Sequence, residues 1–311
     1  MRWYWIVLMV VGALLAFFLI AGYLLFRYIC GTDRKKSASL EGDATRTLKD
    51  YAPLIKQKAV QNASLPHEIV NIKAFDGFTL RAKFYANRLT DRVVILLHGY
   101  HSCVSWDFGA SFEMYYQAGY SILAVDHRGH GSGGDYVGFG ALDRRDVQRW
   151  MDWIVSRCGD SSKIALAGVS MGAATALLVS GNDPIPQLAA VIEDSGFSSM
   201  QDLLQKLIRN MHVPPMPLLA FASLWSKILA GYWFGESCPE HAVLLSQTPT
   251  LFIHGTADAF VPFEMMGRVY AACAAPKEKA VFEGAIHGES SYRDPERYRA
   301  VVCGFLGKYM V

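Results

Sequence analysis

The chain has 311 residues, of which 52% are hydrophobic and 19% charged, a balance that excludes an intrinsically disordered protein. Its net charge is +2; removing Arg2 and Arg27 from the 30 basic residues leaves 28, equal to the 28 acidic ones. The balanced remainder has no excess positive charge for a nucleic-acid partner. Six cysteines without a CxxC pair argue against zinc ribbons and disulfide-dense scaffolds.

The first element is an apolar run from Trp3 to Phe26, 24 residues without a charge or a proline. As a helix it measures about 36 Å, enough to cross a hydrocarbon core of ~30 Å. A cleaved signal peptide is the alternative, but its apolar region is shorter and ends in an A-x-A-like site. Residues 1–30 are therefore predicted to be an uncleaved single-pass membrane anchor.

The charges that flank this run predict its orientation. Arg27, Arg34, Lys35 and Lys36 follow the apolar residues, whereas only Arg2 and the amino terminus precede them. Positive residues favour the cytoplasmic side of a membrane, so the rest of the chain is predicted to lie in the cytoplasm. Cysteines without obvious partners are consistent with that reducing compartment.

Residues 31–66 are polar, of mixed charge and largely without pattern, which predicts a juxtamembrane linker. Part of it is expected to be helical, because Pro53 suits the first turn of a helix that runs to about Val60. A compact domain is predicted from residue 67 to residue 311. It opens with two alternating segments, Ile69–Ala74 and Thr79–Tyr85, which predict a hairpin.

Further along, apolar runs rich in β-branched residues alternate with helical patterns. The runs are Val93–Leu97, Ser121–Val125, Ile164–Ala167, Ala189–Ile192, Leu251–Ile253 and Lys279–Phe282. Continuous rather than alternating runs indicate strands that are covered on both faces. Helical patterns over Asp146–Val155 and after Asp294-Pro295-Glu296 separate or follow them. The fold class is therefore α/β, with a mostly parallel, doubly wound sheet.

One stretch is too long for an ordinary crossover. Residues 197–247 separate two predicted strands and contain helical pattern around a Pro214-Pro215-Met216-Pro217 break. This stretch is interpreted as an inserted helical lid. Its apolar residues either form an acyl pocket or pack the lid onto the sheet; they are Met211, Met216, Leu218, Leu219, Phe221, Leu224 and Trp225.

The sequence Gly168-Val169-Ser170-Met171-Gly172 follows the strand Ile164–Ala167 and precedes an alanine-rich helical segment. This is the G-x-S-x-G nucleophile elbow in the strand-turn-helix context that the motif requires. A serine hydroxyl needs a base, and His287 follows the last predicted strand. The histidine needs an acid, for which Asp258 is favoured and Asp194 is the alternative. The order Ser, Asp, His along the chain is that of an α/β-hydrolase triad.

A tetrahedral intermediate needs hydrogen-bond donors for its oxyanion. The backbone N–H of Met171, just after the nucleophile, is one candidate. The second candidate is the backbone N–H of Tyr100, in the loop His98-Gly99-Tyr100 after the strand Val93–Leu97. The Tyr100 phenol is an alternative donor, or a wall of the acyl pocket. His98 is interpreted as a structural residue that packs under the loop.

No cofactor and no metal are predicted. His127 and His130 lie in the glycine-rich segment Asp126–Gly133, which is better explained as a turn in which Asp126 and Arg128 join loops. Neither a GxxxxGK[ST] phosphate loop nor a GxGxxG sequence opening a helix is present.

With these residues in place, the chain resembles the α/β-hydrolase superfamily from about His67 to Val311. More narrowly, it is similar to membrane-anchored bacterial hydrolases described as serine-aminopeptidase-like or prolyl-oligopeptidase-like. The motifs that carry the resemblance are His98-Gly99-Tyr100, Asp126–Gly131, Tyr136–Gly140, Gly168–Gly172, Asp258 with Val261-Pro262, and His287-Gly288. The resemblance implies the fold and the triad, while the substrate differs widely within this group.

The function predicted from these residues is hydrolysis of carboxylic esters through an acyl-enzyme, with amphipathic or lipid-derived acyl esters as candidate small-molecule substrates. A peptidase or amidase that uses the same triad is the first alternative, in which Glu193, Glu236 or Glu240 would grip a substrate amine. A membrane-tethered binding module is the second. The expected partner is a membrane and not a nucleic acid, and no oligomeric state is predicted.

Overall fold

The computed structural model describes residues 3–32, 48–87, 91–131 and 133–311, and at its centre is an eight-stranded sheet. The strands are β1 Glu68–Lys73, β2 Thr79–Tyr85, β3 Arg92–Leu97, β4 Ser121–Val125, β5 Lys163–Val169, β6 Leu188–Asp194, β7 Thr250–Gly255 and β8 Lys277–Phe282. Their order in the sheet is β1-β2-β4-β3-β5-β6-β7-β8. The β1–β2 and β2–β4 pairs are antiparallel, and every later pair is parallel. This confirms the predicted sheet and the predicted strands.

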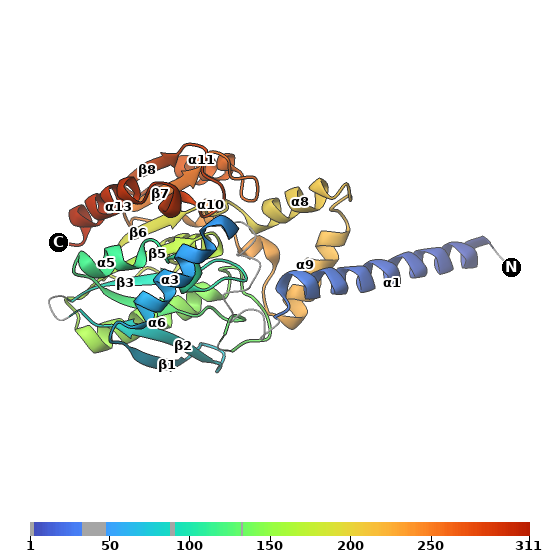
Figure 1. Cartoon of the computed structure of the whole chain (residues 1–311). Coiled ribbons are helices and arrows are strands. Elements are labelled where there is room, and N and C mark those ends of the chain that lie inside the picture. Colours follow the sequence, from blue (N-terminus) through green and yellow to red (C-terminus); the bar gives the residue numbers. More distant parts are fainter. Residues whose placement is uncertain (1–2, 33–47, 88–90, 132) are drawn as a thin grey trace.

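Helices cover both faces of the sheet (Figure 1). They are α1 Trp3–Cys30, η1 Lys49–Tyr51, α3 Ala52–Ala63, α4 Val104–Asp107, α5 Phe112–Gln117, α6 Asp143–Cys158, α7 Met171–Asn182, α8 Met200–Asn210, α9 Leu218–Leu229, η2 Phe234–Glu236, α10 Pro239–Ala242, α11 Phe263–Ala272, α12 Ser290–Arg293 and α13 Pro295–Tyr309. Strand β3 illustrates the layering, because Val93 and Ile95 pack with α6, α7 and α11, while Val94 and Leu96 pack with α5 and α13. Each such buried side chain stabilises the fold by roughly 1.5–3 kcal/mol. This two-sided cover explains the continuous apolar runs.

The segment predicted to be a linker is partly built into the body of the protein. The expected helix is present as α3, with Pro53 in its first turn. Ile55 of this helix is fully buried and packs in one cluster with Trp106 and Tyr292. The range 31–66 is therefore not a free linker throughout, because an apolar side chain in α3 completes the packing of a distant loop and helix. Residues 33–47, with Arg34, Lys35 and Lys36, lie outside the described residues.

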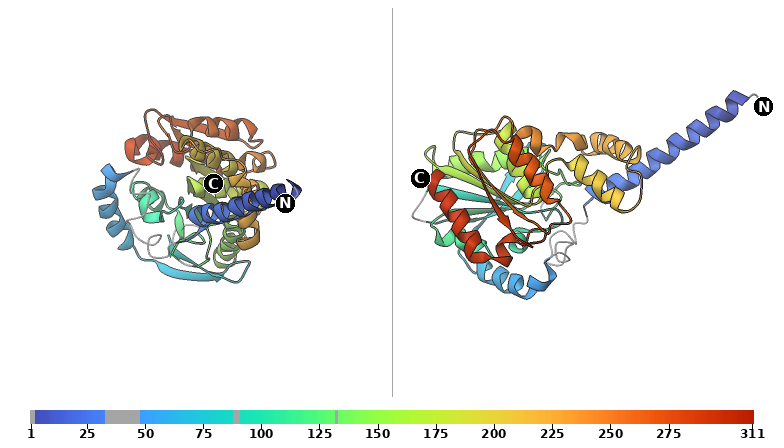
Figure 2. Two further views of the ribbon diagram at one scale, coloured as in Figure 1. Left: turned by 90° about the vertical axis from the view of Figure 1, so that its right-hand side faces the viewer. Right: turned by 90° about the horizontal axis from the view of Figure 1, so that it is seen from above.

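Between β6 and β7 the chain forms α8, α9, η2 and α10. Helices α8 and α9 lie at the end of the molecule from which α1 projects, and the C-terminus lies at the opposite end (Figures 1 and 2). The short helix α10 packs on α7, where a side chain on Gly181 would lie 2.0 Å from the carbonyl oxygen of Ala242. The range predicted to be a lid is thus largely helical, and its helix α9 packs against α1.

Helix α1 has 28 residues and is the one described helix long and apolar enough to cross a membrane. By length and composition it is either a membrane anchor or a signal sequence. Its N-terminal part is largely exposed, whereas Gly22, Phe26, Ile29 and Cys30 are buried. The helix therefore begins free of the body and ends inside it.

Candidate active site

The candidate site is built from loops at the carboxyl edge of the sheet. Strand β3 lies between β4 and β5, so the crossovers diverge on either side of it. Ligands of open α/β sheets bind at such a switch point, beyond the carboxyl ends of the strands. The loops after β3, β5, β7 and β8 carry Tyr100, Ser170, Asp258 and His287 in turn. The topology therefore brings together residues that are up to 187 positions apart.

Ser170 occupies the sharp turn between β5 and α7. Its backbone has φ 55° and ψ −116°, an unfavourable conformation for a residue with a side chain that costs of order 1–3 kcal/mol. Two glycines permit this turn. A Cβ on Gly168 would lie 2.3 Å from the backbone of Gly172, and a Cβ on Gly172 would lie 1.9 Å from the carbonyl oxygen of Leu97. The close approach of strand and helix explains why the motif needs both glycines.

Replacing Gly172 by alanine is expected to destabilise the protein by about 3 kcal/mol or more, because the new methyl group meets rigid backbone of β3. A fall of roughly 10 °C in the melting temperature of the detergent-solubilised chain would correspond to that loss. Gly267→Ala is the matched control, since Gly267 also lies in a helix but has nothing within 4 Å of its missing side chain. It should stabilise the protein by roughly 0.5–1 kcal/mol. Equal melting temperatures for the two variants would contradict this account.

The structure brings Ser170, His287 and Asp258 into one chain of hydrogen bonds. His287 Nε2 lies 2.9 Å from Ser170 Oγ, and His287 Nδ1 lies 2.7 Å from Asp258 Oδ2. The His287 ring also contacts the ring of Phe260, with centroids 5.1 Å apart. With the proton on Nδ1 donated to Asp258, the Nε2 lone pair faces the serine hydroxyl. This arrangement can remove a proton from Ser170.

Asp258 is held as an anion by several donors. Its Oδ1 accepts the backbone N–H groups of Phe260 and Val261 at 3.0 and 2.8 Å. Its Oδ2 lies 3.2 Å from His254 Nε2, in addition to the contact with His287. Burial by itself would raise the pKa of this carboxyl, but the hydrogen bonds from His254 and His287 lower it to about 2.

Asp194, the alternative acid, has a different environment. Its Oδ1 accepts a hydrogen bond from Ser195 Oγ at 2.9 Å, and its backbone carbonyl accepts the N–H of Ser170 at 2.8 Å. Burial raises the pKa of its carboxyl to about 6, against the lowering effect of the Ser195 hydroxyl. Asp194 therefore supports the turn that carries Ser170, whereas Asp258 is the carboxylate that contacts His287.

Two further buried polar residues lie close to Asp258, and no motif in the sequence places them there. Glu193 is 1% exposed and accepts the N–H of Gly196, and His254 is fully buried and contacts the carbonyl oxygen of Val261 at 3.0 Å. Burial raises the pKa of Glu193 to about 7, although the charge of His254 opposes that shift. Both residues extend strands past their apolar runs, and their approach to Asp258 depends on the pairing of β6 with β7.

The raised pKa of Glu193 predicts a pH-dependent stability. The pKa of an ordinary glutamate is 4.5, so the folded state binds the Glu193 proton more tightly than the unfolded state does. This preference stabilises the fold fully below pH 4.5 and is lost as the pH rises through about 7. The loss amounts to roughly 3 kcal/mol. Glu193→Gln removes the titration, so the melting temperature of the variant minus that of the wild type should increase between pH 5 and pH 8. A difference that stays constant over this range would contradict the assignment.

The proposed oxyanion donors lie next to Ser170. Met171 is the first residue of α7, so its N–H belongs to the first turn, where no intrahelical acceptor exists. Gly99 precedes Tyr100, and a Cβ on Gly99 would lie 3.3 Å from Ser170 Cβ. The Tyr100 phenol donates to the carbonyl oxygen of Ile29 at 2.7 Å, and its ring stacks on Phe139. Of the two donors considered for Tyr100, the phenol is therefore engaged by α1.

The loop after β3 is held in place by buried polar contacts. Asp107 accepts the N–H of Gly99 and the hydroxyl of Ser102, both at 2.6 Å. His98 is buried, with its ring nitrogens on the Gly99 carbonyl and the His127 N–H, as expected for a structural residue. Among the described residues, no group of three or more His, Cys, Asp or Glu is arranged to hold a metal ion.

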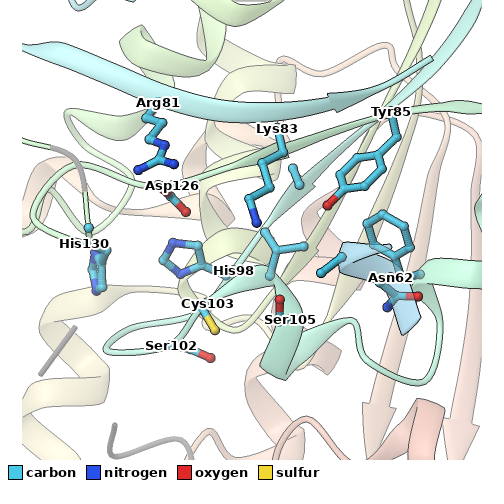
Figure 3. Close-up of a pocket in the computed structure, with 15 residues that line it drawn as sticks. Asn62, Arg81, Lys83, Tyr85, His98, Ser102, Cys103, Ser105, Asp126 and His130 are labelled. Atoms are coloured by element: carbon cyan, nitrogen blue, oxygen red, sulfur yellow. The ribbon is translucent and has the colours of Figure 1, made fainter. Parts of the chain in front are cut away.

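A cavity of about 300 Å³ with a mixed polar and apolar lining lies beside this loop (Figure 3). Arg81, Lys83 and Asp126 line it together with His98, and Lys83 points into it in Figure 3. None of the three hydrogen-bonded side chains of the candidate site lines this cavity. This cavity is therefore separate from the hydrogen-bonded chain of Ser170, His287 and Asp258.

Comparisons with known proteins agree with this fold. Residues 89–232 match the family model of the serine aminopeptidases, S33. The chain is 28% identical over 232 residues to the uncharacterized protein YqkD of Bacillus subtilis, covering 74% of this chain and 76% of YqkD. It is 25% identical to the α/β hydrolase domain-containing protein WAV2 of Arabidopsis thaliana, covering 61% of each chain.

Solved structures give the same result for the fold. The Pyrococcus furiosus esterase Pf2001 superposes with a TM-score of 0.67 at 24% identity, covering 81% of this chain and 94% of the esterase. The Pyrococcus horikoshii acylaminoacyl peptidase superposes with a TM-score of 0.58 at 16% identity, covering 81% of this chain and 43% of the peptidase. The chain is an enzyme of the α/β-hydrolase superfamily, and it is similar to esterases and peptidases alike.

Proposed function

We propose that this enzyme hydrolyses carboxylic esters with Ser170 as nucleophile, His287 as general base and acid, and Asp258 as the orienting carboxylate. The observation that carries the proposal is the hydrogen-bonded chain from Ser170 Oγ through both ring nitrogens of His287 to Asp258 Oδ2, with contacts of 2.9 and 2.7 Å. Nucleophile, base and orienting group within hydrogen-bond reach are the signature of covalent acyl transfer.

In this mechanism Ser170 Oγ attacks the acyl carbon while His287 Nε2 takes its proton. The anionic oxygen of the tetrahedral intermediate accepts hydrogen bonds from the backbone N–H groups of Met171 and Tyr100. His287 then gives its proton to the leaving alcohol, and an acyl ester on Ser170 remains. Water repeats the sequence on the acyl-enzyme, releasing the acid and restoring the serine. The chain's own residues carry each of these proton transfers.

A peptidase that uses the same triad is the second candidate, supported by the matching family model and by the acylaminoacyl peptidase neighbour. The peptidase alternative needs an acidic residue to bind the substrate amine, and the contacts of the three candidates argue against it. Glu193 is buried and accepts the Gly196 N–H, Glu236 pairs with Lys227, and Glu240 pairs with Arg268. Each carboxylate already has a partner within the protein.

We further propose that α1 is a single-pass membrane anchor and that the catalytic body lies on its cytoplasmic side. Support comes from the length of the apolar helix and from the basic residues that follow it. The side of the membrane on which the catalytic body lies is tested with a reporter fused to the C-terminus. Protease treatment of intact and of opened cells is the second test. Digestion of the catalytic body in intact spheroplasts would contradict a cytoplasmic location.

The choice between ester and amide is tested with the full chain, because Phe26, Ile29 and Cys30 of α1 are buried in the body. Initial rates are compared on p-nitrophenyl esters from acetyl to palmitoyl and on aminoacyl-naphthylamides. The proposal expects ester hydrolysis with an optimum at one chain length and little amide turnover. Amide turnover without an ester preference would support the peptidase, and no turnover together with no fluorophosphonate labelling of Ser170 would support a binding module.

A further inference from the structure

Helix α9 is packed tightly against α1. The ring of Phe221 stacks on that of Phe18 with centroids 5.8 Å apart, and Trp225 Nε1 donates to the carbonyl oxygen of Leu19 at 2.9 Å. A Cβ on Gly22 would lie 2.5 Å from Phe221 Cβ, so the two helices approach as closely as a glycine allows. The side of α9 that carries Phe221 and Trp225 is thus covered by residues 18–23 of α1.

The C-terminal end of α1 is bound in the same way to the loops of the candidate site. The carbonyl oxygens of Ile29 and Cys30 accept hydrogen bonds from the Tyr100 phenol and the Val137 N–H, at 2.7 and 2.9 Å. The buried side chains of Phe26 and Ile29 belong to one apolar cluster with Met171, which follows the nucleophile. From Phe18 to Cys30, α1 therefore has a fixed position relative to the active site.

The length of the exposed part of α1 determines how far α9 lies from the membrane. Only Trp3–Phe17, 15 residues or about 22 Å of helix, precedes the first contact with the body. Crossing a hydrocarbon core of ~30 Å takes about 20 residues, more if the helix is tilted, and so extends to about Gly22. Tyr23, and then Arg27 and Tyr28, follow at the positions expected for the membrane interface. The bilayer surface thus reaches the level at which α9 crosses α1.

The surface around α9 has the composition that this position requires. Residues 211–233 contain no acidic residue and only His212 and Lys227 as basic side chains. Their exposed apolar residues, which we call the cap surface, are Met211, Val213, Met216, Ile228, Leu229 and Trp233. An apolar cavity of about 230 Å³ lies under this surface and is lined in part by Met216, Leu219 and Trp233. An amphipathic element of this kind binds at the boundary between headgroups and acyl chains.

We propose that the cap surface and α9 are embedded in the surface of the lipid bilayer, so that the active site receives acyl esters from the membrane phase. This inference rests on the proposed function and on α1 as a membrane anchor. Leu219 and Ala222 of α9 share the apolar cluster of Met171, which connects the embedded helix to the nucleophile turn. A lipid-borne acyl ester is therefore the class of substrate that the site is positioned to meet.

The depth of the cap surface can be measured in the full chain reconstituted in phosphatidylcholine vesicles. The partly exposed native cysteines are first replaced by alanine; they are Cys103, Cys158, Cys238 and Cys303. A nitrobenzoxadiazole dye is then attached to Met216→Cys or Ile228→Cys. The matched controls are Leu245→Cys, in the loop that precedes β7 at the opposite edge of the sheet, and Val311→Cys, with exposed fractions of 71% and 75% in the native residues.

Lipids with a nitroxide high on the acyl chain are expected to lower the fluorescence at 216 and 228 by roughly twofold, while iodide quenches only the dyes at 245 and 311. Iodide quenching at 216 and 228 equal to that of the controls would overturn the proposal. A dye shielded from both quenchers, with crosslinks between copies at 228, would also overturn it in favour of a second copy of the chain.

A kinetic comparison connects this position to the substrate. The double variant Ile228→Glu/Leu229→Glu should hydrolyse water-soluble p-nitrophenyl acetate as the wild type does, but should act at least about tenfold more slowly on a long-chain ester held in vesicles. Equal rates on the vesicle substrate would contradict delivery from the membrane. If no ester is hydrolysed by the wild type, the proposed function fails, while the quenching result still tests the position of α9.

Discussion

Replacing Ser170 by alanine is expected to lower kcat for ester hydrolysis on the order of 10⁶-fold, because no acyl-enzyme can form without its hydroxyl. The contact of Ser170 Oγ is with the catalytic candidate His287, at Nε2, and not with a residue that holds the fold together. The melting temperature should therefore stay close to that of the wild type, which separates loss of chemistry from loss of fold. The measurement is the initial rate on the p-nitrophenyl ester that the wild type hydrolyses fastest, together with fluorophosphonate labelling.

Ser195→Ala is the matched control for this variant. Ser195 also follows a strand at the carboxyl edge and also has a positive φ, of 59°. Its hydroxyl donates to Asp194 rather than to His287. We expect this variant to keep its rate within about tenfold of the wild type and to be labelled by a fluorophosphonate. Substantial ester hydrolysis by Ser170→Ala would show that another residue is the nucleophile.

The strands were predictable from the sequence because both faces of the sheet are covered. A strand such as β3 is then apolar from Val93 to Leu97, and its short length and β-branched residues distinguish the run from a buried helix. The ends of β5, β6 and β7 were underestimated by two residues each. These ends contain Gly168, Glu193 and His254, which continue the hydrogen-bonded pairing although they are not apolar residues.

The candidate triad could be located because glycines and strand ends mark its loops. The sequence could not predict which carboxylate lies within hydrogen-bond distance of His287. Asp194 ends β6 and Asp258 follows β7, and their different positions relative to His287 depend on the lengths and turns of loops in space. His254 is similar, since its approach to Asp258 arises from a turn at residues 255–258 and gives no periodic signal.

The role of the inserted helices was open for a different reason. An apolar helical pattern predicts that a face is covered, without saying by what. Phe221 and Trp225 fit an acyl pocket or a contact with the sheet equally well as sequence, yet their rings pack on α1. The same limit applied to α3, whose Ile55 packs in one cluster with Trp106 and Tyr292, both more than 50 positions away.

Replacing Asp258 by asparagine is expected to lower kcat on the order of 10⁴-fold. The Asn side-chain oxygen can still accept the N–H groups of Phe260 and Val261, as Asp258 Oδ1 does. Its NH₂ group then faces His287 Nδ1 and donates to it. The imidazole must in consequence carry its proton on Nε2, where it can no longer accept the proton of Ser170. The backbone contacts of Oδ1 are kept and the hydrogen bond from His254 to Oδ2 is lost, while His287 is present in the wrong tautomer.

Asp194→Asn discriminates between the two candidate acids, because it changes a buried carboxyl with a pKa of about 6 that contacts Ser195 rather than His287. Its kcat should stay within about tenfold of the wild type, even where the melting temperature changes. Both variants are measured as kcat and KM on the same ester, with the fluorophosphonate labelling rate as a second readout. A large loss in Asp194→Asn with little loss in Asp258→Asn would move the acid role to Asp194. Equal losses without any change in fluorophosphonate labelling would place neither carboxyl in the activation of Ser170, since labelling needs the same deprotonated serine that the ester does.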